Sequence, residues 1–187
     1  IDLMSISSHK FYGPKGIGAL YVRGKPRIRL NSLIDGGGQE MNLRSGTLPV
    51  PLCIGFGEAA KISRKNFKKE FDKTKTLRNL FLSKIKEYFP DVKVNGSLKS
   101  RLPANLNISI KGVNSQTLIS NLKYTVISSG SACSSRDLEP SYVLEGMGLE
   151  DSIIKSAVRI GVGRFTTKND INIAIREIIN IVRKIRC

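Results

Sequence analysis

Two stretches of helical periodicity restrict the fold of this chain more than any other feature of its sequence. In the first, apolar residues from Phe67 to Tyr88 recur mostly at three- and four-residue intervals in a lysine-rich background, which predicts one or two long amphipathic helices that end at Pro90. In the second, Thr167 and Asp170 form a capping-box pattern ahead of a run whose apolar residues mark one face of a terminal helix. Because short apolar segments separate the two runs, we expect an α/β protein.

The segments outside the two runs are short. Strands are expected at residues 1–7, 19–22, 27–34, 92–95, 105–110, 125–128 and 157–162, and helices at residues 114–123 and 139–147. The segment 1–7 is mostly apolar at its start and is expected to be buried, and the glycines and proline that follow it require a turn. The character of the sequence changes near Leu52, which predicts a remnant of one layer over residues 1–52 and a compact α+β domain over residues 53–187.

The charge of the chain is strongly positive. Its 187 residues include 31 Lys and Arg against 15 Asp and Glu, which gives a net charge of +16. Such a surplus attracts polyanions. However, the basic residues are spread along the chain and no nucleic-acid-binding motif is present, so a solvated cationic surface is favoured over a nucleic-acid partner. No apolar run approaches the roughly 20 residues of a membrane helix, so no membrane association is expected.

Cysteine and histidine usage points to a reducing compartment. Cys53, Cys133 and Cys187 are far apart and form neither a CxxC pair nor a disulfide framework, which predicts a cytoplasmic protein. With His9 as the single histidine, the sequence does not favour a metal site.

Two segments could carry chemistry. The first, Ser-Ser-His-Lys at residues 7–10, follows a strand and precedes a glycine-rich turn, where ligands often bind in α/β proteins. If partly desolvated there, the amine of Lys10 could form a Schiff base with an aldehyde cofactor, although an ordinary surface lysine is the alternative. The second places Cys133 among small polar residues, which suits a reactive thiolate on a loop as well as an incidental loop cysteine.

Four motifs occur in a distinctive order. They are Ser-x-His-Lys-x-x-Gly-Pro-Lys-Gly-x-Gly at residues 7–18, Arg-Ser-Gly-Thr at 44–47, Ser-Ser-Gly-Ser-Ala-Cys at 128–133 and Arg-x-x-x-Gly-Arg at 159–164. In this order they closely resemble the pyridoxal-phosphate-dependent cysteine desulfurases of the NifS/IscS class, a branch of the class-V aminotransferases. The resemblance implies the C-terminal part of a fold type I transferase, comprising the end of the large domain and the small α+β domain.

The resemblance also implies roles for individual residues. Lys10 matches the lysine that binds pyridoxal 5'-phosphate covalently, and Ser7 and His9 match residues that contact the cofactor phosphate. Thr47 matches a threonine that reaches the phosphate bound by the other subunit of a homodimer. Cys133 matches the nucleophile that takes sulfur from L-cysteine, and Arg159 the arginine that pairs with the substrate carboxylate.

The implied activity converts L-cysteine to L-alanine with formation of an enzyme persulfide. Its sulfur would pass to an acceptor such as an iron–sulfur scaffold protein or a tRNA-thiolation protein. In the family the catalytic lysine lies near the middle of the chain, whereas here it is residue 10. We therefore expect the acid that pairs with the pyridine nitrogen and the histidine that stacks on the ring to come from a missing N-terminal half, or from a companion chain. A catalytically inactive remnant, an interaction module and a selenocysteine lyase are the alternatives.

Overall fold

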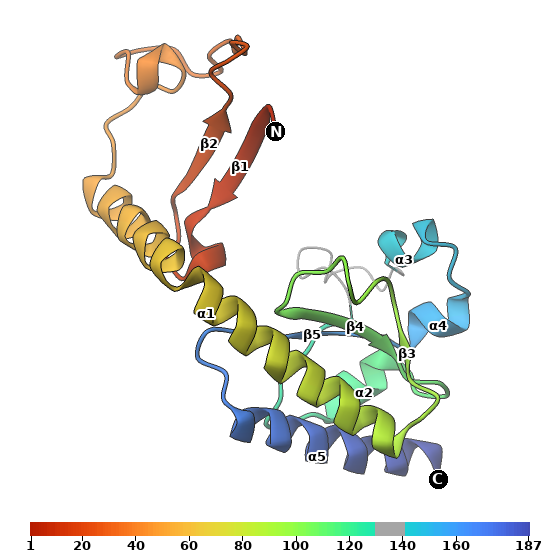
Figure 1. Ribbon diagram of the computed structural model, residues 1–187. Coiled ribbons are helices and arrows are strands. Elements are labelled where there is room, and N and C mark those ends of the chain that lie inside the picture. Colours follow the sequence, from red (N-terminus) through yellow and green to blue (C-terminus); the bar gives the residue numbers. More distant parts are fainter. Residues whose placement is uncertain (130–140) are drawn as a thin grey trace. The chain divides into compact units, whose positions relative to one another are not determined.

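The computed structural model describes residues 1–129 and 141–187 (Figure 1). The chain divides into two compact units, Ile1–Phe67 and Lys68–Cys187, which we call unit 1 and unit 2. The division lies inside a long helix that contributes to both units. The domain boundary that the sequence predicts after residue 52 is a statement about which part of the chain can fold alone, and it stays a prediction.

Unit 1 begins with an antiparallel hairpin. Strand β1 (Leu3–Ser7) pairs with β2 (Gly18–Val22) in a register that runs from Leu3 opposite Val22 to Ser7 opposite Gly18. Both strands are therefore confirmed, but the expected burial of β1 is wrong, because most of its side chains are exposed. Two strands provide no second layer that would cover their faces.

The predicted strand at residues 27–34 is also wrong, since no strand forms there. The hydroxyl of Ser32 accepts a hydrogen bond from the Ile34 backbone N–H at 3.2 Å, and the Ile34 carbonyl accepts one from the Ser45 N–H at 3.3 Å. A local side-chain bond of this kind competes with the ladder of a sheet. The short 3₁₀ helix η2 (Glu40–Asn42) follows.

Helix α1 (Val50–Tyr88) is a single helix of 39 residues. The helical periodicity predicted over its second half is confirmed, and the helix also extends back through Gly55. A Cβ atom at Gly55 would lie 3.0 Å from the Pro14 ring, so glycine allows the turn after η1 (Ser8–Phe11) to approach the helix closely. Phe11 and Phe56 also pack together, with ring centroids 5.5 Å apart.

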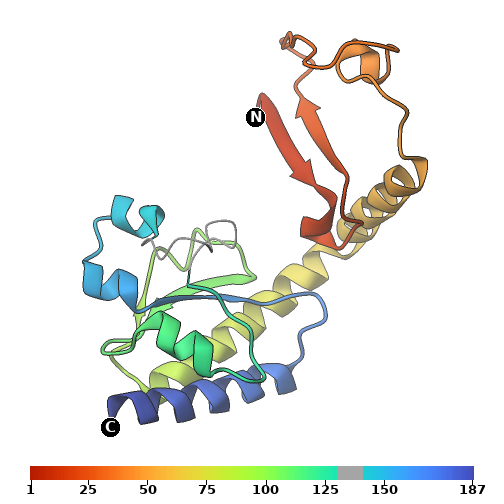
Figure 2. The ribbon, with the colours of Figure 1, turned by 180° about the vertical axis from the view of Figure 1, so that it is seen from behind.

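The described residues of unit 2 form a three-stranded antiparallel sheet with helices. The strand order is β3 (Lys93–Val94), β4 (Asn105–Ser109) and β5 (Ala157–Gly161). Helix α5 (Lys168–Arg186) and the last part of α1 lie on the same side of this sheet in both views (Figure 1, Figure 2). The remaining helices are α2 (Ser115–Asn121), α3 (Tyr142–Gly146) and α4 (Asp151–Lys155).

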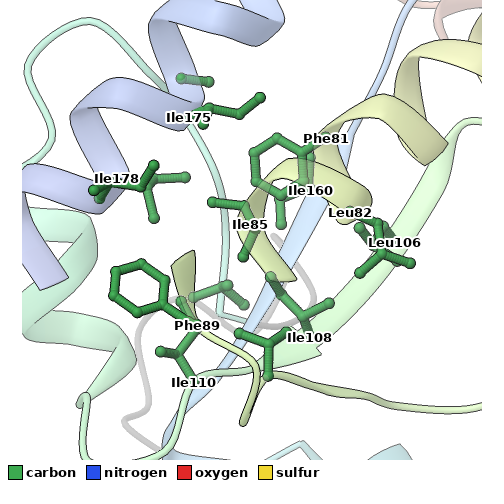
Figure 3. Packing of buried hydrophobic residues seen from close by; sticks show 14 of the residues in the cluster. Phe81, Leu82, Ile85, Phe89, Leu106, Ile108, Ile110, Ile160, Ile175 and Ile178 are labelled. Carbon is green, nitrogen blue, oxygen red and sulfur yellow. The ribbon is translucent and has the colours of Figure 1, made fainter. Parts of the chain in front are cut away.

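The core of unit 2 lies between the sheet and the helices α1 and α5. Phe81 and Ile85 of α1 pack there with Leu106 and Ile108 of β4 and with Ile178 of α5, and each of the five is at most 1% exposed (Figure 3). The apolar periodicity of both predicted helices therefore marks the faces that fill this core. Among the described residues, no helix combines the length and apolar character needed to cross a bilayer.

Most of the remaining predictions for unit 2 are confirmed within a few residues. The exceptions are residues 125–128, where only an isolated bridge between Ser128 and Arg159 forms, and helix α4, which was not predicted. Helix α3 confirms the helix expected at residues 139–147, of which residues 139 and 140 lie outside the described residues.

Candidate functional site

The end of β1 presents three of the predicted site residues together. Ser7 is the last residue of β1, and His9 and Lys10 lie in η1 immediately after it. All three side chains are exposed, whereas Ser8 between them is fully buried. Lys10 is thus not desolvated within this chain, unlike the partly desolvated lysine considered from the sequence.

The turn around Ser8 explains how this corner forms. The Ser8 N–H donates to the Ile17 carbonyl, and the Ser8 carbonyl accepts from the Gly13 N–H, both at 3.1 Å. A Cβ atom at Gly13 would lie 2.0 Å from the Ser8 hydroxyl oxygen, and one at Gly18 would lie 2.5 Å from the Ile6 carbonyl. Two glycines of the motif are therefore required so that the chain can close over Ser8 and turn its neighbours outward.

The exposed groups at this corner have the chemistry that the expected cofactor requires. Within the described residues, none of the hydrogen bonds or ion pairs involves the side chains of Ser7, His9 or Lys10. A hydroxyl and an imidazole can donate to a phosphate ester, and a free amine can react with an aldehyde. The buried Ser8 hydroxyl oxygen also has no hydrogen-bond partner in the described structure. The donor set therefore fits pyridoxal phosphate.

Thr47 lies in a second constrained segment of unit 1. Its neighbour Gly46 has a φ of 117°, and the Gly46 N–H donates to the Gln39 side-chain oxygen at 2.9 Å. Ser45 is buried and Thr47 is exposed just before α1 begins. This placement leaves the Thr47 hydroxyl accessible, as its expected role toward the other subunit requires.

In unit 2, Arg159 lies beside the start of the cysteine motif. It is half-buried in β5, opposite Asn107 of β4. Its backbone N–H donates to the Ser128 carbonyl at 2.6 Å, and its carbonyl accepts from the Ser128 N–H at 3.2 Å. Cys133 itself lies outside the described residues. The structure thus joins the strand of the predicted carboxylate-binding arginine to the first residue of the predicted nucleophile motif.

One anchor of this motif was not predicted. The Gln116 amide nitrogen in α2 donates to the Ser129 hydroxyl oxygen at 3.1 Å. Ser129 belongs to the cysteine motif, but Gln116, 13 residues away, belongs to none of the four motifs, so no signal in a single sequence identifies the pair. Gln116 and Arg159 together fix the chain at Ser128 and Ser129.

Comparisons with known proteins agree with these observations. The family profile described as "Aminotransferase class-V" matches residues 1–173. Relatives named cysteine desulfurase IscS include one from Rickettsia typhi, 48% identical over 186 residues, and one from Vibrio campbellii, 50% identical over 186 residues. Each match covers 100% of this chain, but 45% and 46% of the relative, so the chain spans less than half the length of these curated relatives.

Solved structures support the same fold. A NifS-like protein superimposes with a TM-score of 0.86 at 28% identity, over 98% of this chain and 47% of its own. A NifS-like protein from Rickettsia africae gives a TM-score of 0.85 at 30% identity, over 98% and 48%. The fold is therefore the C-terminal part of the fold type I architecture, as expected. Motifs, fold and similarities together show that the chain belongs to the class-V aminotransferase family.

Proposed function

We propose that this chain carries the C-terminal half of a cysteine desulfurase, which converts L-cysteine into L-alanine and transfers the sulfur to Cys133. The observation that supports this best is the exposed corner at the end of β1, where Ser7, His9 and Lys10 stand free of other side-chain partners. The identity to curated IscS proteins over the full length of the chain adds to it.

Ser7 and His9 would hold the phosphate of pyridoxal phosphate, and Lys10 would bind its aldehyde. When bound, the cofactor supplies an electron sink for the bonds at the substrate Cα. The Nζ atom of Lys10 would then move the proton that leaves Cα. Arg159 would orient the substrate carboxylate through its planar guanidinium, which offers two parallel hydrogen bonds.

The sulfur-transfer step needs no external oxidant. The Cys133 thiolate forms an S–S bond with the substrate sulfur while the substrate C–S bond breaks. The electron pair of that C–S bond stays with carbon, which takes up a proton and becomes the methyl group of alanine. The product on the protein is a Cys133 persulfide, which we propose is passed to an iron–sulfur scaffold or to a tRNA-thiolation protein in the cytoplasm.

The remainder of the site is proposed to come from outside this chain. Thr47 would reach the cofactor phosphate of the partner subunit in a homodimer. The acid and the stacking histidine of the family would come from an N-terminal half, covalently joined or supplied by a companion chain.

Cofactor binding is the first test. The purified chain is titrated with pyridoxal phosphate, reduced with borohydride and digested, and the modified lysines are located by mass spectrometry. We expect Lys10 to be labelled preferentially, a visible absorption band to form, and both signals to be lost in Lys10→Ala. Lys25→Ala, which removes an exposed lysine after β2, is the matched control and should retain them.

Turnover is the second test. The chain is mixed with the N-terminal part of a relative, and alanine and sulfide are measured from L-cysteine. Cys133→Ser should abolish sulfide release. No preferential labelling of Lys10 at any cofactor concentration would instead favour a non-catalytic remnant or interaction module, and preference for selenocysteine over cysteine would favour a lyase.

A further inference from the structure

A cationic groove in unit 2 takes no part in the site described above. It has a volume of about 690 Å³ and lies between one face of α1 and residues 98–103, in the segment that joins β3 to β4. Five of its lining side chains are basic, and none of the lining residues is acidic. The five are Lys75, Arg78, Lys86, Lys99 and Arg101.

Arg78 is the buried member of this cationic groove. It is 3% exposed, and its Nε and Nη2 atoms donate to the side-chain oxygen of Asn79 at 3.1 and 2.8 Å. In the described part of the chain, none of the salt bridges includes Arg78. A buried guanidinium is ordinarily paired with a carboxylate or another anion. The positive charge of Arg78 is therefore left without a compensating negative charge.

A second guanidinium is fixed close to the first. Arg101 donates to the carbonyls of Ser97, at 2.9 Å, and Asn95, and to the Asn105 side-chain oxygen at 3.3 Å. Burial and the charge of Arg78 lower the pKa of Arg101. Two positive charges are thus held near one another by neutral partners, which makes the groove a favourable place for an anion.

The rim of the groove combines exposed lysine side chains with apolar surface. Lys75, Lys86 and Lys99 are exposed and form none of the salt bridges between described residues. The lining also includes the 41% exposed Leu98 and the 37% exposed Phe71. A phosphate ion could not use this apolar surface. The single aromatic ring in the lining would stack one base, whereas surfaces that bind single-stranded nucleic acid stack successive bases. An acidic peptide with apolar side chains fits both the charge and the surface.

We propose that the cationic groove binds a short acidic segment of a partner protein, with its carboxylates on the lysines of the groove and an apolar side chain against Leu98. This inference goes beyond the proposed function, because the groove uses none of the residues assigned to sulfur transfer. Charge complementarity accounts for the attraction and the aliphatic contact for the preference among anions.

The test is direct binding of a fluorescein-labelled peptide of alternating Glu and Leu to the full chain, followed by fluorescence anisotropy at two salt concentrations. We expect salt-dependent binding that the double variant Lys75→Glu/Lys99→Glu weakens about tenfold. The control double variant Lys69→Glu/Lys155→Glu changes the net charge equally, at exposed positions outside the groove, and should weaken binding less than about twofold.

Further probes separate the possible ligands. A Glu–Ser peptide of the same length should bind more weakly than the Glu–Leu peptide, and circular dichroism should show that both double variants fold. Equal weakening by the two double variants would mean attraction to bulk charge and would overturn the proposal. A single-stranded oligonucleotide or inorganic phosphate that binds in the groove more tightly than the peptide would also overturn it. None of these readouts depends on cofactor or turnover, so failure here is distinct from failure of the desulfurase proposal.

Discussion

Arg159 shows at the scale of one residue how the backbone and the side chain can be tested separately. Its backbone N–H and carbonyl both bond to Ser128, and its strand pairs with β4, so a change of side chain leaves this pairing in place. Arg159→Lys keeps the charge but loses the planar pair of donors. We predict about a tenfold rise in KM for L-cysteine with a smaller change in kcat, measured by alanine formation in the complemented protein.

The control for this prediction is Arg176→Lys, the same substitution at an exposed position of α5. It should leave both kinetic constants unchanged. An Arg159→Lys variant that loses kcat while its KM is unaffected would contradict a role in binding the carboxylate.

The candidate residues differ in how far sequence alone could identify them. Ser7, His9 and Lys10 are contiguous, and the glycines that expose them lie in the same motif, so the local sequence contains the whole corner. The pairing of Ser128 with Arg159 depends on tertiary structure instead. The groove could not be predicted from sequence for another reason. In the sequence Lys75 and Lys86 resemble every other lysine of α1, and only the folded structure places the segment 98–103 beside them.

At the scale of elements, the helices and strands specified by neighbouring residues were predicted correctly. The wrong predictions concern features that depend on tertiary packing. The capping box of α5 involves only neighbouring residues, and both of its bonds form. The apolar periodicity that predicts α1 begins at Phe67, whereas the helix begins at Val50, where the close packing of Pro14 on Gly55 depends on tertiary structure. Burial of β1 was predicted wrongly because apolar composition does not reveal which layer covers a strand.

The capping box gives a prediction about pH. The Thr167 N–H donates to Asp170 Oδ2 at 2.8 Å, and the Asp170 N–H donates to Thr167 Oγ1 at 3.2 Å. Hydrogen bonds from the Thr167 backbone and side chain lower the pKa of Asp170. Since the folded state favours the carboxylate, its contribution is complete above the unfolded pKa of about 4 and is lost as pH falls further.

Thermal unfolding of the wild type, Thr167→Ala, Asp170→Ala and the double variant measures this effect. At neutral pH we predict that Thr167→Ala costs about 1 kcal/mol and that the double variant costs less than the two single costs added. The difference in free energy of unfolding between the wild type and Asp170→Ala should be constant from about pH 7 to 5 and shrink below about pH 4. A free-energy difference that grows as the pH falls would contradict the capping role.

At the scale of the whole molecule, apolar burial is divided very unequally between the two units. The twenty described residues of the main hydrophobic cluster all lie between Leu77 and Val182, in unit 2. In unit 1, which the structure describes completely, Ala59 is the one buried hydrophobic residue. Because apolar burial is the main source of folding free energy, the two units should differ strongly in stability.

Native-state hydrogen exchange on the chain without cofactor tests this difference. We predict that amides of β4, β5 and α5 are the slowest to exchange and that those of β1 and β2 exchange almost as fast as unfolded peptide, because an isolated hairpin is marginal in water. A fragment of residues 53–187 should unfold cooperatively, at the same thermal midpoint as unit 2 in the full chain. Residues 1–52 alone should show no cooperative unfolding transition. Hairpin amides as protected as those of β4 would show that burial within the chain does not set its stability.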